Sequence, residues 1–263
     1  MEENKKFKLV SSKKTRYLLP NILTLAGVCL GISSIKFSID GNFSLAVTLI
    51  LLAAILDALD GRVARLIKGT SEFGKELDSL TDFVSFGIAP VFTLYFWELN
   101  KYGKLGWAIT LIYSVCCVLR LARFNLTKIQ EADEWKNNFF EGIPSPAGGL
   151  LILMPLIYEL TDLNIGIDIK KFTPYLTIII AILLVSKIPT LSFKKISISP
   201  KATVFLLLGI GIVFISLLFY TLETLLAFGI VYLISIPVSI LIFKNQNKKI
   251  SDKISDDNHE DIL

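Results

Sequence analysis

Four aspartates, at positions 57, 60, 78 and 82, interrupt two otherwise apolar stretches in the first third of the chain. An α-helix has about 3.6 residues per turn, so Asp57 and Asp60 share one helix face. Asp78 and Asp82 are one turn apart on a second helix. A carboxylate at the centre of a membrane costs about 2.5 to 3.5 kcal/mol on insertion scales. If these helices cross a membrane, other interactions must offset the free-energy cost of their carboxylates.

The chain between the two acidic faces is short, so the two helices are expected to be antiparallel neighbours with their acids facing each other. Four converging carboxylates repel one another unless cations lie between them. Carboxylate oxygens are hard ligands that suit Mg²⁺ or Mn²⁺, and no His or Cys lies between positions 57 and 82. Pairs of such ions commonly act on phosphoryl groups. The acids therefore predict a site for two Mg²⁺ or Mn²⁺ ions.

Small and cationic residues accompany the acids. Gly61 and Gly74 leave room for a ligand to approach the backbone, and Arg65 offers a guanidinium group suited to phosphate. Ser71 shares the second acidic face if that helix extends so far back. Each residue alone has an ordinary explanation in helix packing or in contact with the membrane surface. Their combination with the four acids favours a phosphate-binding site.

Composition places these helices in a membrane. Hydrophobic residues make up 53% of the 263 residues, charged residues make up 19%, and the mean hydropathy is +0.63. Soluble domains carry about 25% charged residues. The apolar residues also occur in long blocks, which argues against a secreted disulfide scaffold, a disordered protein and a soluble α/β enzyme. We predict an all-α fold, a polytopic transmembrane helical bundle.

The hydropathy pattern predicts about eight membrane spans, each near the roughly 20 residues that a span requires. They cover residues 17–37, 43–67, 73–97, 105–123, 146–158, 172–186, 202–222 and 224–243. The fifth and sixth are the shortest, and six spans result if both are re-entrant. The predicted catalytic domain is therefore residues 17–243. A basic cytoplasmic arm (1–16) precedes it, and a polar tail (244–263) that we expect to be disordered follows it.

The distribution of Lys and Arg predicts the orientation. With the N-terminus placed inside, 22 of the 27 Lys and Arg residues lie on the inner side. Only Lys101, Lys104, Lys170 and Lys171 lie in the outer loops. By the positive-inside rule, both termini are expected in the cytoplasm. The acids lie toward the inner ends of their helices, so the predicted site faces the cytoplasm.

The acidic motif resembles the signature of the CDP-alcohol phosphotransferase family. That signature is Asp-x-x-Asp-Gly-x-x-Ala-Arg, eight residues, then Gly-x-x-x-Asp-x-x-x-Asp. It is complete here as Asp57, Asp60, Gly61, Ala64, Arg65, Gly74, Asp78 and Asp82. The resemblance implies an integral membrane transferase of phospholipid biosynthesis. Such an enzyme moves a phosphatidyl or similar group from a CDP-linked donor to an alcohol and releases CMP.

The resemblance also implies a role for each matching residue. Asp57, Asp60 and Asp78 would hold one divalent ion, and Asp57, Asp78 and Asp82 would hold the other. Asp82 would also accept the proton of the attacking hydroxyl. The residues implied to contact the CDP-diacylglycerol donor are Pro20, Asn21, Thr24, Gly61, Arg65, Ser71 and Gly74.

Flanking stretches resemble the branch of the family that makes phosphatidylserine: residues 82–90 (DFVSFGIAP), 120–125 (RLARFN), 140–149 (FEGIPSPAGG) and 186–194 (SKIPTLSFK). This implies transfer of the phosphatidyl group from CDP-diacylglycerol to L-serine. The serine carboxylate requires a cation, for which Arg120 and Arg123 are candidates. Ser85 and Asn125 are candidate hydrogen-bonding partners of serine. Positive-inside placement, helix capping and packing explain these four residues equally well.

Two other functions stay open. A sister enzyme would use another acceptor, such as glycerol 3-phosphate or inositol phosphate, and would need further cations near the site. A cation transporter would explain the acids but would leave Gly61, Arg65 and Gly74 without a role. By analogy with prokaryotic members of the family, we expect the cell (inner) membrane as the location. We also expect a homodimer, which is common in the family, and no nucleic-acid partner.

Overall fold

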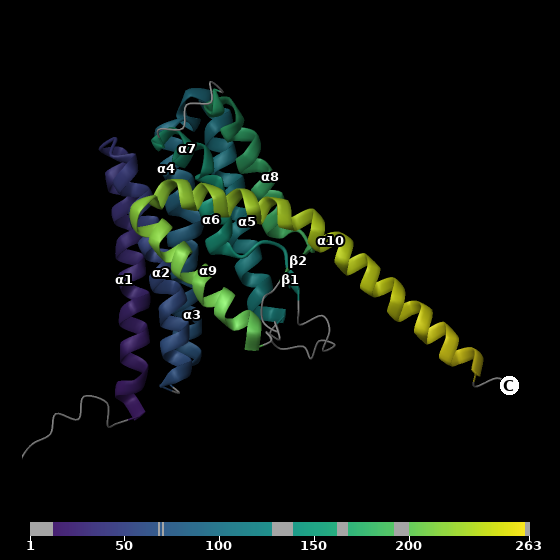
Figure 1. The fold of residues 1–263 in the computed structure, drawn as a ribbon. Helices are drawn as coiled ribbons and strands as arrows, with labels where there is room; N and C mark the ends of the chain where they lie inside the picture. The colour runs from purple at the N-terminus through teal and green to yellow at the C-terminus, as the bar shows by residue number, and fades with distance from the viewer. Residues whose placement is uncertain are drawn as a thin grey trace, which may run out of the picture.

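The protein is a bundle of helices with one small sheet at its side (Figure 1). The computed structural model describes residues 13–67, 69, 71–127, 139–161, 168–191 and 200–260. Helices α1 (Lys13–Ile39) and α2 (Phe43–Leu66) form an antiparallel pair. Gly41, with a φ of +78°, lies in the tight turn between them. Asn42 caps α2 by accepting a hydrogen bond from the Leu45 backbone N–H at 3.2 Å.

The third membrane helix has three parts and begins one residue before the predicted range 73–97. It begins with α3 (Glu72–Asp82), continues as a π-helical turn η1 (Phe83–Ile88) and ends with α4 (Ala89–Trp97). Ser71 caps the start of α3, because its hydroxyl accepts a hydrogen bond from the Gly74 N–H at 3.0 Å. The sequence predicts the bounds of this span well but not the change of helix type inside it.

The second half of the bundle begins after the short 3₁₀ turn η2 (Leu99–Tyr102) with α5 (Lys104–Thr127). The elements that follow are β1 (Phe139–Glu141), α6 (Ser145–Ile152), α7 (Met154–Leu160), η4 (Ile169–Phe172), α8 (Thr173–Val185), β2 (Pro189–Leu191), α9 (Pro200–Phe219) and α10 (Thr221–Glu260). Strands β1 and β2 pair antiparallel, with Phe140 opposite Thr190. The sequence did not predict this small sheet.

Five helices in the described part of the chain are long and apolar enough to cross a membrane: Leu18–Ile39, Phe43–Leu66, Glu72–Trp97, Lys104–Leu126 and Thr221–Phe243. The protein is therefore a helical, multi-pass membrane protein. The predicted fifth span is divided at Leu153 into α6 and α7, with Pro155 at the start of α7. The predicted sixth span, α8, has 13 residues and extends about 20 Å, short of a hydrocarbon core of about 30 Å. Eight spans and cytoplasmic termini stay predictions.

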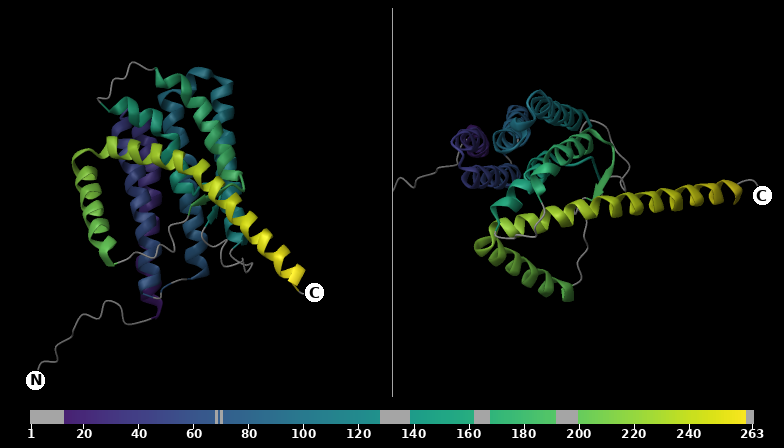
Figure 2. Two further views of the ribbon diagram at one scale, coloured as in Figure 1. Left: turned by 45° about the vertical axis from the view of Figure 1, so that its right-hand side comes forward. Right: turned by 90° about the horizontal axis from the view of Figure 1, so that it is seen from above.

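Helix α10 continues to Glu260, whereas the sequence predicts a disordered tail from residue 244. Adding residues to an existing helix needs no new nucleus, and residues 244–260 contain no Gly or Pro. In Figure 1 this helix crosses in front of the bundle and its C-terminal part projects away from it, while Figure 2 shows α9 beside its first turns. Most of the N-terminal arm, residues 1–12, lies outside the described residues.

The apolar core lies among α4, α5, α6, α7 and α8. Leu94, Tyr113, Ile152 and Leu184 are all fully buried there. The outer faces of α1, α9 and α10 instead expose many large apolar side chains, which suits contact with lipid rather than water. The core thus includes α4, the end of the third membrane helix, whose first part, α3, carries Asp78 and Asp82.

Candidate active site

Three of the four predicted acids converge between α2 and α3. Asp57, Asp60 and Asp78 each place a carboxylate oxygen within 4.8 Å of the others. Asp60 is buried, and the other two are half-buried. Helix α2 ends at Leu66 and α3 begins at Glu72, and α3 returns beside the end of α2, as the sequence predicts. Three carboxylates at this separation offer the oxygen ligands that a hard divalent cation prefers.

Asp82, the last residue of α3, lies one turn further along than Asp78. Its side chain interacts with that of Asp57 and stands outside the group of three acids. Its Oδ1 atom is buried and has no hydrogen-bond partner in the described part of the chain. A buried carboxylate oxygen without a partner is costly. A divalent ion near Asp57 would satisfy it, so the residues present fit a metal site.

Helix α1 supports the acids from the opposite side. The buried Thr24 hydroxyl contacts Asp60 Oδ2 at 2.5 Å and the Pro20 carbonyl oxygen at 3.0 Å. The contact with Asp60 fixes the orientation of that carboxylate, as hydrogen bonds to metal ligands commonly do. The resemblance implies that Thr24 contacts the nucleotide. In this structure it also orients a predicted metal ligand.

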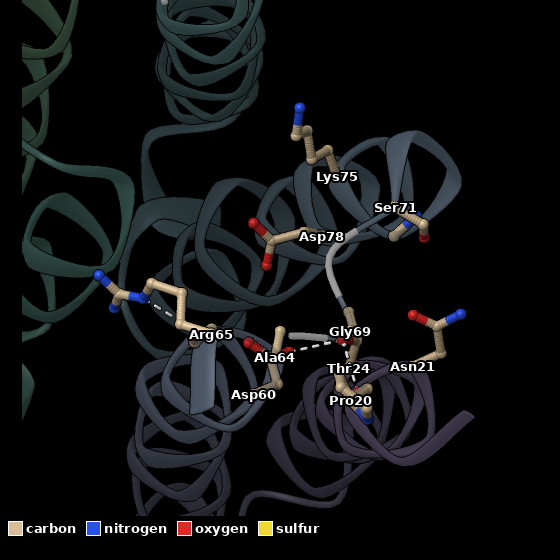
Figure 3. Close-up of a pocket in the computed structure, with 12 residues that line it drawn as sticks. Pro20, Asn21, Thr24, Asp60, Ala64, Arg65, Gly69, Ser71, Lys75 and Asp78 are labelled. Carbon is tan, nitrogen blue, oxygen red and sulfur yellow. Dashed lines mark hydrogen bonds between the residues drawn. The ribbon is translucent and has the colours of Figure 1, made fainter. Parts of the chain in front are cut away.

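A cavity of about 320 Å³ opens beside the acids, between the first turns of α1, the last turns of α2 and the start of α3 (Figure 3). All seven residues that the resemblance assigns to the CDP-lipid line it, namely Pro20, Asn21, Thr24, Gly61, Arg65, Ser71 and Gly74. Asp60 and Asp78 line it as well. The structure therefore brings together two sets of residues that are separated by more than thirty positions in the sequence.

The small residues shape this cavity. A Cβ atom at Gly61 would meet nothing within 4 Å, so this glycine borders open space. A Cβ atom at Gly74 would lie 3.2 Å from Asn21 Oδ1, which makes Gly74 a point of close approach between α3 and α1. Arg65 donates from Nε to the Gly61 carbonyl at 3.0 Å, and in Figure 3 its guanidinium lies across the cavity from Asn21.

The cavity also contains residues that the sequence analysis did not assign to the site: Ala64, Gly69 and Lys75. Lys75 precedes Asp78 by three positions, so the two share a helix face. That spacing could have identified Lys75 as a second cation near the cavity. In the structure its amino group is 2.6 Å from Glu72 Oε1 at the exposed rim.

Two arginines of α5 have different surroundings. Arg120 donates from one terminal nitrogen to the Ser145 hydroxyl at 2.6 Å, and it lies close enough to Asp57 and Asp82 to interact with their charges. Arg123 donates to the Val185 and Ser186 carbonyls at 2.6 and 3.0 Å, at the end of α8. Only Arg120 is therefore directed toward the acids. Ser145, at the start of α6, was not identified from the sequence.

The other two predicted serine contacts lie in helix interfaces. Ser85 is buried and donates to the Gly27 carbonyl at 3.2 Å, which joins η1 to α1. Asn125 donates from Nδ2 to the Ser79 hydroxyl at 3.0 Å, which joins α5 to α3. Both sets of contacts agree with the packing explanation that the sequence left open. Of the two arginines of α5, Arg120 is thus the one near Asp57 and Asp82.

A model of the CDP-alcohol phosphatidyltransferase family matches residues 17–188. The chain belongs to this family, as the motif indicates. It is 33% identical over 234 residues to a Helicobacter pylori protein named CDP-diacylglycerol–serine O-phosphatidyltransferase, covering 88% of this chain and 97% of that protein. A protein of the same name from Mycobacterium tuberculosis is 37% identical over 196 residues, covering 74% of this chain and 68% of the relative. A protein of the same name from Bacillus subtilis is 33% identical over 178 residues, covering 67% of this chain and 92% of the relative.

Proposed function

We propose that this protein is an enzyme that transfers the phosphatidyl group of CDP-diacylglycerol to the hydroxyl of L-serine, producing phosphatidylserine and CMP. The observation that carries the proposal is the convergence of Asp57, Asp60 and Asp78 beside a cavity lined by all seven expected donor contacts. The names of the relatives support serine as the acceptor.

The acids are the proposed ligands of two divalent ions, Mg²⁺ or Mn²⁺. Asp57, Asp60 and Asp78 would hold one ion, and Asp57, Asp78 and Asp82 would hold the other. When bound, the ions would neutralise the diphosphate and stabilise the leaving CMP. Because Asp57 contacts Asp82 as well as the group of three, it is the acid shared by both sets.

The cavity is the proposed donor site. It lies at the end of the bundle where α1 begins and α2 ends (Figure 1), which we assign to the cytoplasmic side of the cell membrane. CDP could enter this space from water while the acyl chains stay in lipid. Asn21 and Ser71 offer hydrogen-bonding groups, and Arg65 and Lys75 offer positive charges for phosphate oxygens.

Asp82 is the proposed general base. The serine hydroxyl oxygen attacks the β-phosphorus, which carries the lipid, and its proton passes to an Asp82 carboxylate oxygen. The bond between the β-phosphorus and the oxygen that bridges the two phosphates breaks, and CMP leaves with that oxygen. The unpartnered Oδ1 of Asp82 leaves the residue able to accept this proton or to bind an ion.

Arg120 is the proposed partner of the serine carboxylate, because it approaches Asp82 from α5 and a guanidinium pairs well with a carboxylate. We assign Arg123 to the support of α8, and Ser85 and Asn125 to helix packing, on the basis of their hydrogen bonds. A homodimer stays a proposal based on the family.

The test of the proposal is a panel of labelled alcohols. The purified full-length protein is incubated with CDP-diacylglycerol, Mg²⁺ or Mn²⁺, and serine, glycerol 3-phosphate or inositol phosphate. We expect labelled lipid and CMP with serine alone. Labelling with a phosphorylated acceptor instead would identify a sister enzyme. Absence of metal-dependent CMP release with every alcohol would favour the cation transporter.

Replacing Arg120 by Lys should raise the KM for serine by about tenfold or more, because one point charge replaces a two-pronged contact with the carboxylate. The KM for CDP-diacylglycerol should change little. Steady-state kinetics with each substrate varied in turn provides the measurement. Arg123→Lys is the matched control: it should lower thermal stability, through the lost carbonyl contacts, and leave the serine KM near normal. Equal serine KM values for the two variants would remove Arg120 from this role.

A further inference from the structure

A π-helical turn, η1, follows Asp82 directly. The Ala89 N–H donates to the Val84 carbonyl, five residues back, instead of to the usual fourth. Such a turn holds one more residue than an α-helical turn, so it rotates α3 relative to α4 by about 100° compared with a continuous α-helix. The directions of Asp78 and Asp82 therefore depend on whether this turn persists.

The sequence supplies a reason for the turn. In a regular α-helix the Phe86 carbonyl would accept a hydrogen bond from residue 90, but residue 90 is proline and has no N–H. The ring of Pro90 would also clash with that carbonyl. The wider turn relieves the clash. Proline at position 90 cannot donate to the Phe86 carbonyl oxygen, which lies in a fully buried part of the protein, where a carbonyl requires a hydrogen-bond donor.

Helix α5 supplies that donor. The hydroxyl of Tyr113 donates to the Phe86 carbonyl oxygen at 3.1 Å, and both residues are fully buried. The hydroxyl of the next residue, Ser114, lies 3.3 Å from the Gly87 carbonyl oxygen and 3.0 Å from the Thr110 carbonyl oxygen of its own helix. Hydrogen bonds in such a low-dielectric interior are strong, and leaving one partner unsatisfied is costly.

Helix α6 confines the same carbonyl from another side. A Cβ atom at Gly149 would lie 3.1 Å from the Phe86 carbonyl oxygen, so the α6 backbone packs directly on the turn. The turn therefore lies between two helices, and Tyr113 provides a hydrogen bond that a purely apolar side chain could not. Tyr113, which does not line the cavity, thus contacts the turn that directly follows Asp82.

We propose that Tyr113 is a positioning residue for the acids, because its hydroxyl donates to the buried Phe86 carbonyl, to which Pro90 cannot donate. This bond holds the register of η1 and so keeps Asp78 and Asp82 facing Asp57. The proposal rests on the metal site described under the proposed function. It adds a residue from α5 whose effect on metal binding acts through the backbone.

The test measures Mn²⁺ binding to the purified full-length protein by electron paramagnetic resonance, without substrate. Tyr113→Phe removes only the hydroxyl and should weaken Mn²⁺ binding by about tenfold, the lower end of the effects seen for residues that orient metal ligands. Thr110→Val is the matched control, since Thr110 is a buried residue one turn earlier on α5 that donates to its own helix, at the Gly106 carbonyl. This variant should keep wild-type affinity.

A second comparison tests the role of the proline. Pro90→Ala restores an N–H to the helix, so Tyr113→Phe should weaken Mn²⁺ binding less in that background than in the wild type. If Tyr113→Phe does not fold, Ser114→Ala tests the neighbouring bond and should also weaken binding.

Wild-type affinity in Tyr113→Phe, or an equal loss in Thr110→Val, would overturn the inference. If Ser114→Ala replaces Tyr113→Phe in the test, wild-type Mn²⁺ affinity in Ser114→Ala would also overturn the inference. If the unmodified protein binds no Mn²⁺, the proposed metal site fails instead, and the two failures are distinguishable.

Discussion

Replacing Asp82 by Asn should lower the rate of phosphatidyl transfer by about 10² to 10⁴-fold, the usual contribution of a general base. The amide keeps the shape of the side chain but accepts a proton poorly. It also removes the charge of an oxygen atom that is buried and has no partner among the described residues. The fold should survive, since the change relieves a desolvated charge beside Asp57. CMP release by the purified variant, with serine and CDP-diacylglycerol at saturation, measures the effect.

Glu76→Gln is the matched control for this substitution. Glu76 is an exposed carboxylate on the same helix, α3. This variant should retain near-normal turnover, because Glu76 does not line the cavity. Binding of CDP-diacylglycerol to Asp82→Asn should also persist, since Asp82 is absent from the cavity lining. Turnover by Asp82→Asn close to that of Glu76→Gln would exclude Asp82 as the base.

Local periodicity explains why so much of this site could be predicted from the sequence. The two acid pairs follow helical spacing, the apolar runs delimit α2 and the third membrane helix, and the short connection makes the helices antiparallel. These are short-range properties of the chain. They sufficed to predict that Asp57, Asp60 and Asp78 converge, and the resemblance to the family identified seven of the residues that line the cavity.

Features that depend on distant contacts could not be predicted in this way. Strands β1 and β2 have three residues each and pair across about fifty positions, so no local pattern indicates them. The two arginines of α5 are equivalent by sequence alone. Carbonyls near residue 185 and the hydroxyl of Ser145 distinguish them only once the chain is folded. The displacement of Asp82 from the group of three acids likewise depends on how α3 packs.

The π-helical turn could be predicted from the sequence only in part. Pro90 was visible in the sequence, and a proline inside an apolar helix predicts a disturbance four residues earlier. Whether that disturbance becomes a kink, a break or a π-turn depends on the donors nearby. Here Tyr113 supplies one. The predicted fifth span contains a similar local signal at Pro155 and instead divides into α6 and α7.

Asp57→Asn should affect activity and stability in opposite directions. Asp57 contacts every other acid of the site, so its loss should prevent binding of both proposed ions. Turnover should fall by about a thousandfold, since bound cations contribute several kcal/mol to stabilising the charge of the transition state. Without metal, however, the variant has one fewer charge among acids whose oxygens lie within 4.8 Å. Its metal-free thermal midpoint should therefore equal or exceed that of the wild type.

The measurement is thermal unfolding with and without Mn²⁺. At a metal concentration of about 100 times Kd, binding stabilises a folded protein by about 2.7 kcal/mol, so the wild-type midpoint should rise. Asp57→Asn should show no rise, whereas Glu76→Gln should respond like the wild type because Glu76 is exposed on α3. A metal-free midpoint well below the wild type, together with an unchanged response to Mn²⁺, would mean that Asp57 supports the fold rather than the ions. A fall in turnover together with an equal or higher metal-free midpoint distinguishes a carboxylate that binds cations from one that stabilises the packing.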